Sequence, residues 1–270
     1  MSAEVAAAVV DGVPTTLAGA ALAVTDAGVA RGDGAFETIG VWDGAPFRLE
    51  DHLARLDASL GKMLLPPADA GLLREDLARL LQPVTGDAAL RCYVTASGTR
   101  VATLAPQPSR APLRHLVPQY APWVVPPEAY PLAGAKTMSY GPNMTATRAA
   151  QRAGGDDALL VSADGTVLEG PTFCVLWVVD GVLCGVAPER GIVDSISRRS
   201  LLDLAREEGV PTRDAEIDVA GLGMVDEVLV CSSVRPVTAL QQVGQQRFDG
   251  PTPVADALAR ALEDARRGRR

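Results

Sequence analysis

Four Asp-Gly dipeptides, each lying between two apolar runs, constrain the fold of this 270-residue chain more than any other feature. They are Asp11-Gly12, Asp43-Gly44, Asp164-Gly165 and Asp180-Gly181. Asp-Gly readily adopts the positive φ angles of tight turns, so each pair predicts a β-hairpin. Because the pairs occur in both halves of the chain, we expect antiparallel hairpins to be its main building unit.

Helical patterns lie between the predicted hairpins. Leucines recur every three or four residues over 49–64 and again over 68–81, the spacing of an amphipathic helix. Similar patterns predict helices over 145–153, 195–208 and 254–267. Hairpins and helices in both halves predict an α+β fold.

Prolines are dense between residues 106 and 131. Because proline fixes φ and lacks a backbone donor, this stretch cannot all be helix or central sheet. We expect 118–127 to connect a small α/β domain over 1–117 to a larger, strand-rich α/β domain over 128–270. A short strand is expected at His115-Leu116-Val117.

Composition excludes several classes of protein. The chain has 25 basic and 33 acidic residues, which argues against nucleic acid or an anionic membrane as its main partner. The 47% hydrophobic content excludes a mostly disordered chain. No apolar run approaches the roughly 18 residues of a membrane span, and the N-terminus lacks the basic region of a signal peptide.

The cysteines indicate the compartment in which the protein is found. Cys92, Cys174, Cys184 and Cys231 each stand alone in an apolar run, without the pairing or nearby histidines of a zinc site. We therefore expect buried, reduced thiols, no metal, and a cytoplasmic protein.

Lysine is scarce in this chain. Of its 25 lysine and arginine residues, only Lys62 and Lys136 are lysines. Any reaction that needs a primary side-chain amine must use one of these two. Lys136 stands between Ala135 and Thr137, and partial burial in such surroundings would favour the neutral amine that Schiff-base chemistry needs. A surface lysine at the end of a strand is the alternative interpretation.

Five sequence blocks together resemble the class IV aminotransferases. The longest block, KTMSYGPNMTATRAAQRAGGDDALLVSADGTVLEGPT, runs from Lys136 to Thr172 and is similar to the lysine-to-glutamate signature of that family. The other blocks follow the family's order: RGDGAFETI (31–39), FRLEDHLARL (47–56), SISRRSLLDLA (195–205) and DEVLVCSSVRPV (226–237). The resemblance implies a two-domain fold-type-IV enzyme with a pseudo-barrel-like C-terminal domain. It also implies pyridoxal phosphate as cofactor and a homodimer.

The resemblance also implies which residues bind the cofactor. Lys136 matches the lysine that binds pyridoxal phosphate covalently, and Glu169 matches the carboxylate that pairs with the pyridine nitrogen. Tyr140 is expected beside the cofactor. The phosphate is expected at a helix start, where free N–H groups attract anions, and at nearby polar side chains. These phosphate residues are Arg55, Ser195, Ile196, Ser197 and Ser233, with Ser195 and Ser197 replacing the family's Gly and Thr.

The residues that bind the substrate are less well determined by the resemblance. Arg91 interrupts an apolar strand and matches an arginine on the substrate-carboxylate side of branched-chain aminotransferases. Arg31 and Glu37 are expected to line the pocket from their block positions. Arg100 lies near the Arg-x-His carboxylate trap of D-amino acid aminotransferases, but no histidine accompanies it.

Three functions remain open on this evidence. The main hypothesis is a transaminase that moves an amino group between an amino acid, of D or branched-chain type, or an amine and a 2-oxo acid. The alternative is a 4-amino-4-deoxychorismate lyase, which would form 4-aminobenzoate and pyruvate. The third hypothesis is a pseudo-enzyme that binds pyridoxal phosphate without turnover.

Overall fold

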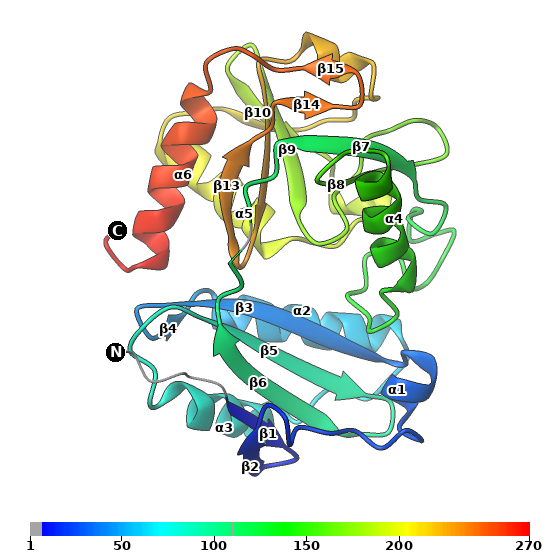
Figure 1. Cartoon of the computed structure of the whole chain (residues 1–270), viewed down its shortest axis with the longest axis vertical. Helices are drawn as coiled ribbons and strands as arrows, with labels where there is room; N and C mark the ends of the chain where they lie inside the picture. Colours follow the sequence, from blue (N-terminus) through cyan, green and yellow to red (C-terminus); the bar gives the residue numbers. More distant parts are fainter. Residues whose placement is uncertain (1–6, 110) are drawn as a thin grey trace. The chain divides into compact units, whose positions relative to one another are not determined.

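The computed structural model describes residues 7–109 and 111–270, and the chain divides into two compact units. Unit 1 spans Met1–Ser109 and Ala135–Tyr140, and unit 2 spans Arg110–Gly134 and Gly141–Arg270. Figure 1 labels the helices and strands of both units. Residues 1–6, on which the expected lack of a signal peptide partly depends, lie outside the described residues.

Unit 1 is an antiparallel sheet covered on one face by helices. Its strand order is β2-β1-β6-β5-β3-β4. The strands are β1 (Ala7–Val10), β2 (Val13–Thr16), β3 (Gly34–Trp42), β4 (Ala45–Pro46), β5 (Ala88–Thr95) and β6 (Arg100–Pro106). The helices are α1 (Ala27–Arg31), α2 (Leu49–Lys62) and α3 (Ala70–Leu81). Alternate residues of β3, β5 and β6 pack on the leucines of α2 and α3 and form the core of this unit.

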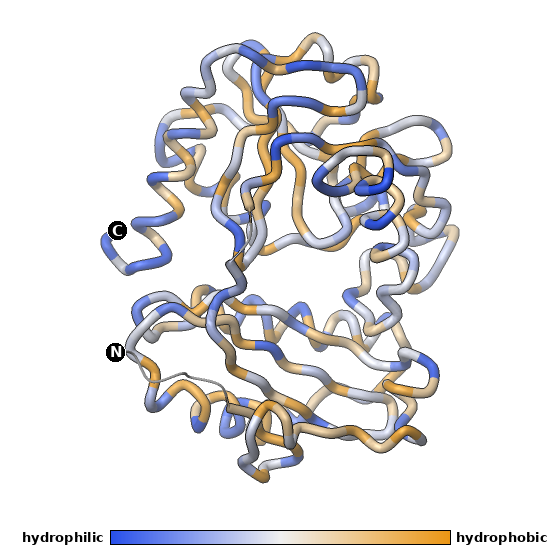
Figure 2. Tube along the Cα trace, in the orientation of Figure 1, coloured by the Kyte–Doolittle hydropathy of each residue, from blue (hydrophilic) through white to orange (hydrophobic). Residues whose placement is uncertain are grey.

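Unit 2 contains two sheets. The larger has the order β11-β10-β9-β12-β13 and the smaller the order β15-β14-β7-β8. Its strands are β7 (His115–Tyr120), β8 (Asp157–Val161), β9 (Cys174–Val179), β10 (Val182–Gly185), β11 (Thr212–Asp214), β12 (Glu227–Ser232), β13 (Arg235–Ala239), β14 (Gln242–Val243) and β15 (Gln246–Arg247). Its α-helices are α4 (Gly141–Arg152), α5 (Ile196–Glu207) and α6 (Pro253–Arg266). The central strand β9 is almost uniformly hydrophobic and buried, as expected of a strand covered on both faces (Figure 2).

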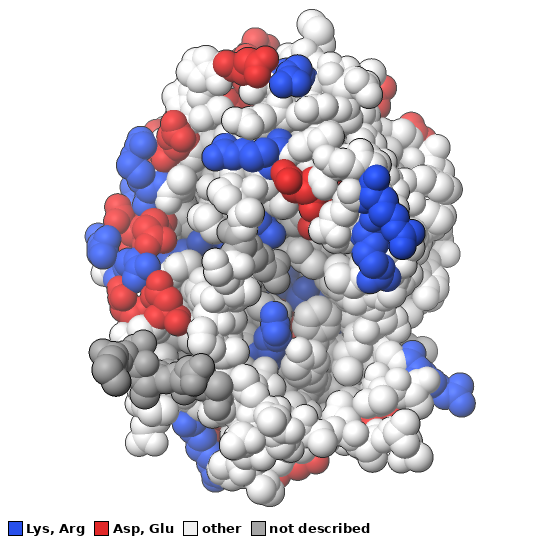
Figure 3. Space-filling model, viewed as in Figure 1, with Lys and Arg blue, Asp and Glu red and all other residues white. Residues whose placement is uncertain are grey.

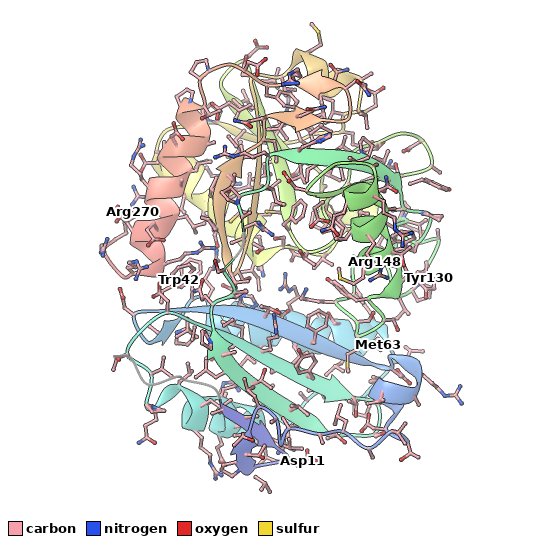
Figure 4. The ribbon with its side chains drawn as sticks, viewed as in Figure 1. Asp11, Trp42, Met63, Tyr130, Arg148 and Arg270 are labelled. Atoms are coloured by element: carbon pink, nitrogen blue, oxygen red, sulfur yellow. The ribbon has the colours of Figure 1, made fainter. Side chains whose placement is uncertain are left out.

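The hairpin predictions are confirmed. Asp11-Gly12, Asp43-Gly44 and Asp180-Gly181 each have positive φ at both residues and join β1 to β2, β3 to β4 and β9 to β10. Asp11 can be seen at the tip of the β1–β2 hairpin (Figure 4). In Asp164-Gly165 only the glycine has a positive φ, and it closes a longer turn in which Ser162 N–H donates to the Thr166 carbonyl. The five expected helices are also present, with ends shifted by at most a few residues.

The division into units differs from the expected linker over 118–127. Pro118 belongs to β7, where it lies opposite Leu159 of β8. On the other side of β7, the two-residue strand β14 pairs only with His115 and Leu116, so it ends before the proline. The chain returns to unit 1 at Ala135–Tyr140, and this return brings Lys136 into the N-terminal unit.

No helix in residues 7–109 and 111–270 is long and apolar enough to span a membrane. The four cysteines are free and buried, as predicted.

Candidate active site

Lys136 is held by its backbone from two sides. Its carbonyl accepts a hydrogen bond from Phe36 N–H of β3 at 3.1 Å, and its N–H donates to Ser59 Oγ of α2 at 3.0 Å. The next residue, Thr137, forms an antiparallel bridge with Ala35. Sheet and helix together therefore fix the origin and direction of the half-buried lysine side chain.

Aromatic rings surround the lysine amine. Nζ lies 4.4 Å from the centroid of the Phe36 ring and donates to the Tyr140 hydroxyl at 3.2 Å. Phe36 meets Tyr140 edge to face at 5.1 Å between centroids and stacks on Tyr93 at 5.8 Å. Cation–π attraction and the hydroxyl hold the amine in place without neutralising it by a carboxylate. Such an amine is well placed to react with a carbonyl group.

A buried network of charged residues lies beneath this lysine. Arg55 of α2 donates from Nε and Nη2 to the two carboxylate oxygens of Glu37, both at 2.7 Å. His52 Nδ1 lies 2.7 Å from Glu37 Oε2. Ser59 connects the network to Lys136, because its hydroxyl donates to the Arg55 carbonyl and accepts from Lys136 N–H.

The charge state of this network follows from its contacts. Burial by itself would raise the pKa of Glu37, but the charge of Arg55 and the hydrogen bonds from His52 and Arg55 lower it to about 2. Burial lowers the pKa of His52, and the positive charges of Arg55 and Lys136 add to this effect against the opposing influence of Glu37. His52 is therefore neutral near pH 7, and its Nδ1 carries the proton because an ionised carboxylate only accepts hydrogen bonds.

Two of the residues predicted to contact the substrate have protein partners in the structure. Glu37 is fully buried, and both of its oxygens are occupied by Arg55 and His52, so its contacts hold the Arg55 side chain in position. Arg100 lies opposite Val94 on the helix-covered face of the sheet, where it pairs with Asp76 of α3 at 3.3 Å. A position within a matching block does not determine which face of a strand a side chain occupies.

Arg91 lies on the other face of that sheet. It is half-buried, and its register places it between Thr38 of β3 and Thr103 of β6. Burial raises the pKa of the Tyr93 phenol, while the charge of Arg91 and a hydrogen bond between the two side chains oppose that rise. Arg91 thus shares a face with Phe36 and Tyr93, the rings next to the lysine. The fourth predicted residue, Arg31, is exposed at the end of the short helix α1.

Glu169 of unit 2 is buried beside β8. Its carbonyl accepts from Leu160 N–H at 2.8 Å, and its Oε1 accepts from Val193 N–H at 3.1 Å. Val193 belongs to the loop that leads into α5. Gly191, in the same loop, has φ 89°, and a Cβ there would lie 1.8 Å from the Val125 carbonyl oxygen, so only glycine fits. This loop connects the buried carboxylate to the helix start that sequence analysis assigned to phosphate.

Ser195 is the N-cap of α5. Its side chain accepts from Arg198 N–H at 3.2 Å, and its carbonyl accepts from Arg199 N–H. With φ −72° and ψ 118°, Ser195 has an extended backbone that any residue adopts, so serine replaces the family's glycine without strain. The first N–H groups of a helix have no intrahelical partner, which makes Ile196 and Ser197 the natural anion donors here.

Ser233 lies in the two-residue turn between β12 and β13 and is half-buried. Unit 1 therefore brings together Lys136, Tyr140, Arg55 and Arg91, while Glu169, Ser195, Ser197 and Ser233 all belong to unit 2.

Sequence analysis missed four residues of the unit 1 site. Phe36 and Ser59 contact Lys136, His52 contacts Glu37, and the Tyr93 side chain forms a hydrogen bond with Arg91. The alternation in GAFETIGVW was an available signal. It puts Ala35, Glu37 and Ile39 on the core face and Phe36 on the other, so Glu37 had to have a buried partner.

Comparison with known proteins identifies the family of the chain. Residues 34–243 match the family model described as amino-transferase class IV. A bifunctional aminodeoxychorismate lyase / D-amino acid transaminase of Mycobacterium tuberculosis is 28% identical over 272 residues, covering 89% of this chain and 91% of the relative.

Two solved structures extend the likeness to the fold. A hypothetical aminotransferase from Mycobacterium tuberculosis, in its PLP-bound form, has a TM-score of 0.88 and 28% identity, covering 98% of this chain and all of the other. A fold IV transaminase from Curtobacterium pusillum has a TM-score of 0.86 and 29% identity over 93% of each chain. These structures confirm the predicted α+β, fold-type-IV class. The chain belongs to the class IV aminotransferase family and is a pyridoxal-phosphate-dependent enzyme.

Proposed function

We propose that this enzyme transfers an amino group from an amino acid to a 2-oxo acid, with Lys136 as the residue that binds pyridoxal phosphate. The observation that carries the proposal is the Lys136 amine, which is fixed by β3 and α2 and surrounded by Phe36 and Tyr140. Lys62, the only other lysine, is exposed in the last turn of α2.

The donor groups of the chain suit this cofactor. An aldehyde needs a primary amine, a pyridine nitrogen needs a carboxylate, and a phosphate needs backbone N–H groups, hydroxyls and a cation. Lys136, Glu169 and the start of α5 are the candidates for these three parts. Ser197, Ser233 and Arg55 would complete the phosphate contacts. When bound, the cofactor supplies an electron sink for the bond that breaks at the substrate Cα.

The residues around Lys136 support a role in proton transfer. Once displaced by the amino donor, the Nζ of Lys136 would remove the proton from the substrate Cα and deliver it to the cofactor carbon C4′. The Tyr140 hydroxyl, 3.2 Å from Nζ, orients the amine for this transfer. Glu37 keeps Arg55 in one orientation, and the guanidinium is permanently charged, as suits a phosphate ligand.

Arg91 is the proposed carboxylate ligand of the substrate. It shares the face of β3 and β5 with Phe36 and Tyr93, and hydroxyl-bearing Thr38 and Thr103 flank it. An arginine with neighbouring hydroxyls recognises a carboxylate through charge-assisted hydrogen bonds.

The finer properties of the enzyme belong to the same proposal. We expect the enzyme to be a homodimer. We also expect it in the cytoplasm, and the free, buried cysteines support that compartment. Light scattering after size-exclusion chromatography would measure the mass, and a monomer would contradict the expectation.

The relative from Mycobacterium tuberculosis, named as both a lyase and a transaminase, makes aminodeoxychorismate lyase a second candidate. Both reactions begin at the same lysine, and they differ in whether pyruvate leaves without an amino acceptor. Pyruvate release from aminodeoxychorismate, measured without a 2-oxo acid, favours the lyase.

One experiment tests the main proposal. The visible absorbance of the enzyme with pyridoxal phosphate is recorded before and after D-amino acids, L-amino acids and amines are added singly. Loss of the band with at least one donor, and its return with a 2-oxo acid, is expected. Lys136→Ala should show neither change, whereas Lys62→Ala should behave as wild type. A wild type that binds the cofactor but responds to no donor would support a pseudo-enzyme instead.

A further inference from the structure

Helix α6 is attached at both ends to the strand that leads to Ser233. Glu227, at the start of β12, is buried and accepts from Val254 N–H at 2.9 Å and from Ala255 N–H at 2.8 Å. At the other end of the helix, Arg266 is only 5% exposed. Its Nη2 donates to the Ser232 carbonyl at 2.7 Å and to the Arg235 carbonyl at 3.2 Å. Figure 1 shows α6 lying beside β13.

The two carbonyls that Arg266 binds belong to Ser232 and Arg235, the paired residues that close the β12–β13 turn. Ser232 pairs with Arg235, which leaves Ser233 and Val234 as the turn residues. Both keep a negative φ, whereas two-residue hairpins favour the positive φ of type I′ and II′ turns. The register also shifts between Val230 and Ser232. Local sequence therefore does not determine this turn, and Arg266 is a contact from outside that fixes it.

The same guanidinium also lies next to Cys231, whose thiol interacts with the second predicted phosphate element, the start of α5. Arg266 Nη2 lies 3.9 Å from Cys231 Sγ. Burial raises the pKa of the Cys231 thiol, and the charge of Arg266 and a hydrogen bond with the Ser197 side chain act in the opposite direction. One buried arginine thus adjoins the turn that carries Ser233 and, through a thiol, the start of α5.

The outer surface of this helix end is charged but ordinary. Arg270 pairs with Glu207, the last residue of α5, and with Glu208, which follows it, and Arg267 pairs with Glu263 at 2.5 Å. Figure 3 shows acidic and basic side chains side by side over this part of unit 2. Exposed pairs of this kind contribute little, so the buried Arg266 is the feature of α6 that can act on the turn.

We propose that Arg266 is a positioning residue for the cofactor phosphate. It fixes the Ser233 turn directly and Ser197 through Cys231, and it adds positive charge behind both. The inference rests on the proposed assignment of the phosphate to these serines. It makes the C-terminal helix part of the cofactor site, although α6 itself would touch no cofactor atom.

The test compares pyridoxal phosphate with pyridoxal, which lacks the phosphate. Dissociation constants for both are measured by absorbance titration of wild type, Arg266→Met, Arg266→Lys, Ser233→Ala and the exposed control Arg260→Met. We expect Arg266→Met to weaken binding of pyridoxal phosphate at least tenfold and that of pyridoxal less than twofold. Arg266→Lys should recover part of the loss, and Arg260→Met should match wild type.

Each other result overturns the inference for a different reason. An equal loss for both compounds would show general damage to the fold. The deciding quantity is the dissociation constant for pyridoxal divided by that for pyridoxal phosphate. If this ratio is unchanged in Arg266→Met but lowered in Ser233→Ala, the role of Arg266 is rejected and the proposed function is left intact. A wild type with equal affinity for both compounds would reject the phosphate assignment itself. If Arg266→Met does not fold, as judged by circular dichroism, Arg266→Lys decides by the same ratio, with a loss of at least threefold expected and no loss overturning the inference.

Discussion

Replacing Glu37 by glutamine tests the buried network that positions Arg55. The carboxylate is fully buried, with Arg55 on both oxygens and His52 on one. Its pKa is about 2 against an ordinary value of 4.5. Since each unit is worth about 1.4 kcal/mol, ionised Glu37 stabilises the fold by roughly 3 kcal/mol at neutral pH. We expect Glu37→Gln to lower the free energy of unfolding by about that amount.

The pH of the measurement follows from the direction of the two pKa shifts. Glu37 has a lowered pKa in the folded protein, so its contribution is fully present above the unfolded value of 4.5 and is lost as the pH falls toward 2. His52 also has a lowered pKa, so the unfolded chain binds its proton first below about 6.5 and stability falls there. At pH 8 Glu37 is ionised and His52 neutral in both states, and only the interactions of the ionised carboxylate differ.

The assay is urea unfolding of the cofactor-free protein at pH 8. The chain has three tryptophans, and replacing Trp123 and Trp177 by phenylalanine leaves Trp42 of β3 as a fluorescent reporter of unit 1. The control is Glu50→Gln, which removes an exposed pair with Arg74 and should change stability little.

A double-mutant cycle decides whether the reasoning is right. Glu37→Gln and Arg55→Met remove the two partners of one buried ion pair, so together they should cost about 2 kcal/mol less than the sum of the single losses. Strictly additive losses would refute the network, because they would mean that the two side chains do not stabilise each other.

Three further predictions concern single positions. Gly191→Ala should lower the stability of unit 2 by roughly 3 kcal/mol or more, because its φ is 89° and a Cβ would strike the Val125 carbonyl; urea unfolding with no loss would contradict this. Arg91→Met should raise the KM for amino acid donors at least tenfold, whereas Arg100→Met should lower thermal stability and leave that KM unchanged; the reverse pattern in steady-state kinetics would exchange their roles. Ser195→Ala should cost about 1 kcal/mol as a lost N-cap and Ser195→Gly only a few tenths, and equal melting temperatures for the two variants would argue against capping.

The hairpins and helices could be predicted because they depend on local chemistry. Asp11-Gly12 and Asp43-Gly44 adopt the positive φ angles that two-residue hairpin turns favour, and leucine spacing marks the helix faces. The linker could not be predicted in this way. Whether Pro118 is tolerated in a strand depends on where the distant strand β14 ends, and local sequence does not contain that information.

The same limit applies to the candidate site residues. The order of the sequence blocks was enough to select Lys136 as the candidate lysine. Its contacts with Tyr140 and Phe36 in unit 1 fit the expected chemistry. The partners of Glu37 and Arg100 could not be predicted, because they depend on the face of a strand, which the pairing of β3, β5 and β6 sets. A carboxylate between the core residues Ala35 and Ile39 had to find a buried cation, and α2 supplied it.

The scarcity of lysine has a physical consequence in this structure. Arginine makes the buried contacts that need a permanent charge: Arg55 with Glu37, and Arg266 with backbone carbonyls. A guanidinium cannot lose its proton in a protein, so it can neither attack an aldehyde nor carry a proton between atoms. Lys136, in contrast, contacts aromatic rings and a hydroxyl, which do not bind its charge as a carboxylate would. The chain thus assigns structural charge to arginine and leaves the amine of Lys136 for chemistry.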